Sequence, residues 1–192
     1  MNFKDLLVET VTDPASAARR IISMQLSFDV VWTGFALNVV LSVFLYAVQG
    51  YLLGYPSNTL FPGLSPAMFG VFLVVLQLSY TIASITAAKW MGREANFTTI
   101  LGLLVWLRIV NIIVQVIAIV LVFVIAPVAV LFNLAAAVYG LYVLAHFTNV
   151  GFGLNSMARS AGVIVLAGIG AMIAVLILMG LFLPTILETS NV

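Results

Sequence analysis

The sequence predicts an all-α, polytopic integral membrane protein, in which a bundle of five transmembrane helices follows an N-terminal amphipathic helix at the membrane interface. Composition is the first observation behind this class. Hydrophobic residues make up 64% of the chain and charged residues 7%, whereas soluble domains have roughly 45–50% and 25%. Lipid must therefore cover the apolar surface, and one membrane domain accounts for nearly the whole chain.

The second observation is an apolar run over residues 109–158, which contains no Asp, Glu, Lys or Arg and a single histidine, His146. A membrane-spanning helix needs about 20 apolar residues, so this run is long enough for two passes. Pro127 lies near its middle, and proline in the first turn of a helix loses no helical hydrogen bond. The run therefore predicts two passes that reverse tightly at this proline.

Residues 1–29 form a predicted amphipathic leader, which lacks the features of a cleaved secretory signal and is expected to be retained. Asp13 followed by Pro14 is typical of a helix start. A helix over residues 14–28 places serines and arginines on one face and apolar side chains on the other. This helix is too polar to span. Two placements remain open, at the headgroup boundary or packed on the cytoplasmic face of the protein itself, and both can hold together.

The predicted transmembrane domain covers residues 30–183, and residues 184–192 form a short non-cytoplasmic tail. Trp32 opens the first pass, as expected of an aromatic side chain at the membrane interface. Residues 97–107 are expected to be a shallow or tilted lead-in to the third pass, because Arg108 follows them within the apolar run. The five passes are predicted at about residues 30–54, 67–88, 98–126, 128–148 and 161–183.

All seven Lys and Arg residues fall on one side of this predicted bundle. Because Lys and Arg are retained in the cytoplasm, an odd number of passes places the N-terminus inside and the C-terminus outside. The opposite side, with the loop of residues 55–66 and the turn at Pro127, has no cation. Four of the cations are expected to contact lipid headgroups: Arg19, Arg20, Lys89 and Arg93.

Arg108, Asn111 and Gln115 recur at helical spacing and line one face of the third pass. An arginine in hydrocarbon is costly and marks function unless it snorkels to the interface or finds a partner. Asp29 and Glu94 are expected at the same membrane level. The simplest interpretation is an ion pair between Arg108 and one of these acids, or lipid phosphate. The alternative is a transport pathway along this polar face.

No catalytic, metal or cofactor constellation is visible in the sequence. The chain has no Cys, which excludes thiolate nucleophiles and iron–sulfur clusters, and the lone His146 cannot complete a metal site. A net charge of +1, with scattered cations, argues against nucleic acid as a partner. We predict a non-enzymatic protein without cofactor or metal, whose partners are the phospholipid membrane and another membrane protein or a second copy of the chain.

Small residues at helical spacing predict close packing between the passes, because helices in lipid associate where their backbones approach closely. Three passes carry such stripes, namely Ser79, Ala83 and Ala87 in the second, Ala136 and Gly140 in the fourth, and Ala167, Gly170, Ala171 and Ala174 in the fifth. The polar side chains of the other passes are expected to hydrogen-bond between helices rather than to line a pathway, namely Asn38, Gln49, Gln77 and Asn133.

A series of motifs follows in order along nearly the whole chain: Asp13-Pro14, Trp32, Gly92 to Phe97 leading into Thr99-Ile100-Leu101 and Trp106, Pro127, Gly140-Leu141-Tyr142, and the loop from His146 to Ala161. This order resembles the YIP (Ypt/Rab-interacting protein) domain family in its small bacterial form. The resemblance implies five transmembrane helices with a cytoplasmic N-terminus, here in a bacterial inner (plasma) membrane with a periplasmic C-terminus.

Eukaryotic members of that family bind small GTPases in vesicle traffic through an Asp-Leu-Tyr-Gly-Pro-type signature. Only Asp5-Leu6-Leu7 stands in this chain, so GTPase binding is not carried over and no functional residue is transferred. Three functions remain open. The first is a scaffold or accessory subunit that organises lipid or a protein partner, and the second is a transporter of small solutes or ions. The third is an enzyme that acts on lipid, which would need Asp29 and Glu94 to converge on His146.

Overall fold

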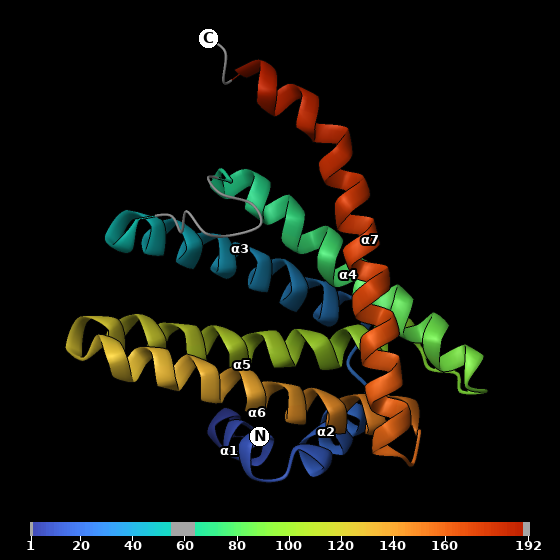
Figure 1. Cartoon of the computed structure of the whole chain (residues 1–192). Coiled ribbons are helices and arrows are strands. Elements are labelled where there is room, and N and C mark those ends of the chain that lie inside the picture. The colour runs from blue at the N-terminus through green and yellow to red at the C-terminus, as the bar shows by residue number, and fades with distance from the viewer. Residues whose placement is uncertain (1, 55–63, 190–192) are drawn as a thin grey trace.

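The computed structural model describes residues 2–54 and 64–189 of the chain, with side chains up to Leu181, and this part consists of α-helices (Figure 1). Five of the helices are long and apolar enough to cross a membrane, which confirms the predicted polytopic helical class. Most of the predicted loop of residues 55–66, and the end of the tail, lie outside the described residues. The helices are α1 (Phe3–Thr12), α2 (Pro14–Ser23), α3 (Phe28–Leu53), α4 (Pro66–Trp90), α5 (Phe97–Val124), α6 (Ala126–Phe152) and α7 (Met157–Thr189).

The predicted helix start at Asp13 is confirmed. The Asp13 carboxylate accepts a hydrogen bond from the backbone N–H of Ser16 at 3.0 Å, and Pro14 occupies the first turn of α2. The helix ends at Ser23, earlier than predicted, because Gln25 adopts a left-handed conformation with φ of 46°. A left-handed residue interrupts a right-handed helix.

The leader contains a second helix, α1, which the sequence analysis did not expect. α1 and α2 pack against each other and are joined by an ion pair between Arg20 Nη1 and Glu9 Oε2 at 2.7 Å. We call α1 and α2 together the N-terminal hairpin.

The third spanning helix, α5, is continuous over its 28 residues, about 42 Å at 1.5 Å per residue. The expected lead-in is its most deeply buried part, since Ile100, Leu101 and Leu103 are at most 3% exposed. Arg108 therefore lies in the interior of this helix, about three turns from its start.

The spanning helices form two packed pairs. α7 packs most extensively against α4, and α5 lies beside α6 in an antiparallel hairpin that reverses at Ile125, while α3 contacts both α4 and α5. Figure 1 shows the α4–α5 and α6–α7 connections at the same end of the bundle. Lys89 and Arg93 lie at or next to the first connection, and Arg159 lies in the first turn of α7 after the second.

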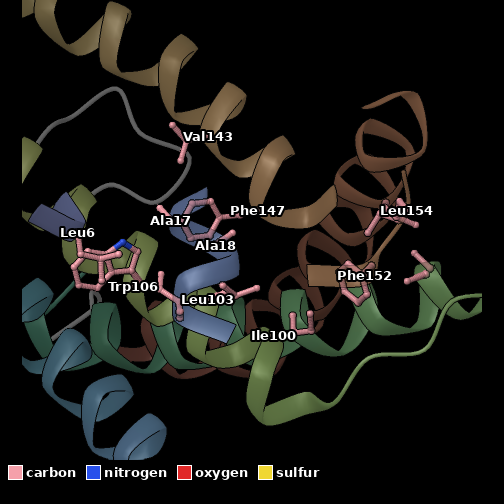
Figure 2. Close-up of a cluster of buried hydrophobic side chains, with 14 residues drawn as sticks. Leu6, Ala17, Ala18, Ile100, Leu103, Trp106, Val143, Phe147, Phe152 and Leu154 are labelled. Atoms are coloured by element: carbon pink, nitrogen blue, oxygen red, sulfur yellow. The ribbon is translucent and has the colours of Figure 1, made fainter. Parts of the chain in front are cut away.

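The N-terminal hairpin packs on α6 and α5 and contributes to the main hydrophobic core (Figure 2). Leu6, Ala17 and Ala18 from the hairpin are at most 1% exposed and share this core with Trp106 and Phe147. The apolar face of the hairpin therefore packs against the protein itself.

Polar contacts also hold α1 in place. The indole Nε1 of Trp106 donates a hydrogen bond to Thr10 Oγ1 at 2.9 Å, and this hydroxyl donates to the carbonyl of Leu6 at 2.7 Å. The Tyr139 hydroxyl donates to the carbonyl of Val11 at the end of α1. The hairpin is thus joined to both α5 and α6.

The α4–α7 interface uses the small-residue stripes of both helices. A Cβ atom at Gly170 would lie only 2.8 Å from Cβ of Ala83, and Ala167 and Ala171 are at most 2% exposed. Between α3 and α5, Asn38 Nδ2 donates to the carbonyl of Val105 at 2.8 Å. These are the close approaches and interhelical hydrogen bonds that stabilise helix packing in lipid.

Candidate functional site: a groove between the spanning helices

A cavity of about 1370 Å³ lies among α4, α5, α6 and α7, with Thr10 and Val11 of α1 at one side. Its lining residues Leu141, Met172 and Leu176 are 54–62% exposed, so the cavity opens to the surface of the bundle. We call it the groove. Its volume exceeds the roughly 300–1,000 Å³ of typical small-molecule pockets.

The groove is mostly apolar but contains a small set of polar side chains. Its apolar lining comes from residues such as Leu76, Leu104 and Val175. One cation, Arg108, lies in the lining, which contains no Asp or Glu. The polar lining residues are Thr10, Gln77, Tyr80, Arg108, Asn111, Asn133 and Tyr139.

Arg108 has no ionic partner in the described part of the chain, where the ion pair of the N-terminal hairpin is the only one. The structure does not bring Arg108 together with Asp29 or Glu94. Asp29 lies in the first turn of α3, Glu94 in the turn between α4 and α5, and both are exposed. The arginine instead faces the groove.

Two further donors in the groove have no acceptor. Gln77 Nε2 and the hydroxyl of Tyr80 are buried and make no hydrogen bond within the described residues. They are one helical turn apart on α4. Tyr80 precedes the end of α4 by about three turns and Arg108 follows the start of α5 by about three turns. Because α4 and α5 are consecutive helices, the three donors lie at similar distances from their shared end.

The structure brings two of the three residues of the predicted polar face on the third pass into the groove. Asn111 lines it beside Arg108, whereas Gln115 is not among its lining residues. Tyr80 and Tyr139 were missed by the sequence analysis. Tyr80 follows Gln77 by one turn, so the sequence indicated that the two polar side chains share one face of the helix. No comparable spacing pointed to Tyr139.

The residues expected to contact headgroups lie outside the groove. Arg19 is exposed and its Nη2 donates to Ser16 Oγ at 2.9 Å, and Lys89 is exposed at the end of α4. Arg93 is half-buried after α4, and Arg20 is held by Glu9.

Hydrogen bonds from the side chain and backbone of Ser16 hold the pKa of Asp13 below its ordinary value of 3.8. This carboxylate therefore stays ionised at neutral pH and caps α2. His146 contacts the ring of Tyr142, with ring centroids 4.5 Å apart. The residues that the structure describes contain no group of three His, Asp or Glu side chains suited to a metal ion, so Asp29 and Glu94 do not converge on the histidine.

The fold and the groove together define a class: a polytopic helical membrane protein whose spanning helices enclose a large groove between them. A model of the Yip1 domain matches residues 8–189, which is nearly the whole chain. The chain therefore belongs to the Yip1 domain family, which is not known as enzymatic. The searches of curated proteins and of solved structures found no match.

Proposed function

We propose that the protein is a non-enzymatic membrane scaffold that organises lipid, and that the groove is where it holds a lipid molecule. The groove carries this proposal. It is larger than a small-molecule pocket, mostly apolar, and open to the surface of helices that are exposed to the bilayer. Such a surface suits acyl chains.

Glycines in the groove allow a direct test. A Cβ atom at Gly140 or Gly168 would meet nothing within 4 Å, and both residues line the groove. Gly140→Leu would place a side chain where an acyl chain lies without disturbing neighbouring helices. Gly180→Leu is a matched control, because Gly180 is also open but lies outside the groove.

The measurement is native mass spectrometry of the full chain released from lipid nanodiscs. The wild type and Gly180→Leu are expected to retain a lipid, and Gly140→Leu is expected to lose it. A protein that emerges only as a monomer, with neither lipid nor partner bound, contradicts the scaffold function. A retained copy of the chain or another membrane protein instead supports the protein partner that the scaffold also allows.

We further propose a bacterial inner membrane as the location, with the N-terminus in the cytoplasm and the C-terminus in the periplasm. The support is the gathering of Lys89, Arg93 and Arg159 at one end of the bundle, since cations remain in the cytoplasm. The chain has no Cys, so single cysteines can be placed at Arg19 and at Val192. A membrane-impermeant maleimide applied to intact spheroplasts should label only the cysteine at position 192.

Transport of a small solute or ion is the second candidate, because Arg108 and Asn111 line the same groove as Gln77. In this case the intramembrane arginine would attract an anion. Arg108→Ala would then abolish flux into liposomes. Liposomes with the wild-type protein that show no flux of phosphate, chloride or small carboxylates would remove this candidate.

A further inference from the structure

We propose that the occupant of the groove is a single glycerophospholipid with a net negative headgroup, and that Arg108, Gln77 and Tyr80 hold its phosphate. This inference rests on the proposed function and names the class of lipid.

Charge complementarity selects an anion. Arg108 is the only cation of the lining and has no ion pair among the described residues. An arginine in a low-dielectric site is costly unless an opposite charge accompanies it. Guanidinium groups also bind phosphate by two parallel hydrogen bonds. An anionic phosphate in the groove would therefore compensate the one charge that the protein leaves uncompensated there.

The unpaired polar groups select a ligand rich in acceptors. Gln77 Nε2 and the Tyr80 hydroxyl are both donors, both buried, and both without an acceptor in the described chain. Buried donors without partners cost about 1–3 kcal/mol each. Phosphate oxygens accept several hydrogen bonds at once, so a phosphate in the groove offers acceptors for these donors as well as for the guanidinium, once the side chains turn toward it.

The missing acids favour a headgroup without an ammonium group. Phosphatidylcholine and phosphatidylethanolamine carry an ammonium group beside the phosphate, and this group needs a carboxylate when it leaves water. The lining contains no Asp or Glu. A headgroup such as glycerol, which carries hydroxyls and no cation, fits this lining without an unpaired charge.

The depth of the site has a physical consequence. A helix of about 42 Å extends beyond a hydrocarbon core of about 30 Å by some 6 Å at each end, so the backbone of Arg108 lies roughly 10 Å below the core boundary. The arginine side chain can reach back toward the interface, but a phosphate bound to it is still drawn inward from its leaflet. The phosphate of the bound lipid therefore lies deeper in the membrane than the phosphates of the surrounding lipids.

The experiment titrates the delipidated full chain with phosphatidylglycerol or phosphatidylcholine of identical acyl chains and measures bound lipid by native mass spectrometry. Arg108→Gln removes the cation of the groove, and Arg159→Gln removes an exposed cation outside it. The wild type is expected to bind one phosphatidylglycerol in preference to phosphatidylcholine. Arg108→Gln should bind phosphatidylglycerol about ten- to hundred-fold more weakly, because it loses hydrogen bonds to a charged partner, and Arg159→Gln should bind it as the wild type does.

Tyr80→Phe is the second variant, which keeps the ring and removes one donor, and it should weaken phosphatidylglycerol binding about five-fold while leaving its acyl-chain contacts. Equal affinity for the two lipids, or unchanged binding in Arg108→Gln, would overturn the headgroup assignment and leave a lipid-holding groove intact. The absence of any retained lipid or partner would instead remove the proposed function itself. These two failures are separate results of one titration.

Discussion

The attachment of α1 to α5 depends on one buried hydroxyl, and Thr10→Val should release it. Thr10 is fully buried and its Oγ1 accepts the hydrogen bond of the Trp106 indole at 2.9 Å. Valine has nearly the same shape as threonine but offers no acceptor. The indole N–H would then remain buried without a partner, because Trp106 is only 9% exposed.

The expected magnitude is the cost of one unsatisfied buried donor, about 1–3 kcal/mol. This cost falls on the docking of the N-terminal hairpin, since both partners lie in its interface with α5. The population of the undocked hairpin should rise about five- to hundred-fold. Hydrogen exchange of the backbone amides of residues 3–23, measured by mass spectrometry in nanodiscs, should accelerate by the same factor.

Thr12→Val is the matched control. Thr12 lies in the same helix and its Oγ1 donates to the carbonyl of Val8 at 3.0 Å, on an exposed face. Water or headgroups can replace this bond, so exchange in the hairpin should change less than two-fold. If Thr10→Val and Thr12→Val accelerated exchange equally, or if neither did, the Thr10–Trp106 contact would not be what holds α1.

Four further results are expected. Arg20→Gln should weaken the packing of α1 on α2 by about 0.2–1 kcal/mol. Hydrogen exchange in the hairpin should follow this loss, and added salt should bring the exchange rate of the wild type closer to that of the variant. Gly170→Ala should lower thermal stability in detergent by about 1–3 kcal/mol relative to Gly180→Ala, because only the former lacks space for a Cβ; equal stabilities would contradict the close α4–α7 approach. Asn38→Val should cost about 0.6 kcal/mol, and at most about 1.7, in the same assay, and a stabilised variant would contradict its interhelical bond. The pKa of Asp13 is lowered below 3.8 in the folded state, so its stabilising contribution is present above the unfolded value of 3.8 and is lost as the pH falls from there through the lower folded pKa. Exchange in α2 should rise over this acidic range, and Asp13→Asn should remove the dependence.

The spanning helices could be predicted from the sequence because each contains an apolar stretch long enough to cross a membrane. Lipid surrounds them, so length and composition alone identify them. The start of α2 was equally predictable, because Asp13 and Pro14 act on their own helix. Its end was not, because it depends on the left-handed conformation of Gln25, which nothing in the local sequence requires.

The apolar character that reveals the helices also hides the groove in the sequence. A helix that is apolar on every side has no stripe to show which face meets a neighbour. The packing of α4 on α7 and of α5 on α6 decides that Gln77 and Arg108 face one cavity and that Gln115 does not. α1 was missed because Lys4, Asp5 and Glu9 interrupt its apolar residues.

The hydrogen bond between Tyr139 and Val11 joins residues that are 128 positions apart. At a synthesis rate of about 5–20 residues per second, the ribosome needs roughly 6–26 seconds between making these two residues. The N-terminal hairpin is therefore translated first but waits for its docking surface on α6, with its apolar face uncovered. During this interval the bilayer surface is an apolar boundary on which that face can rest, so contact with lipid can precede contact with α6 in the life of one polypeptide.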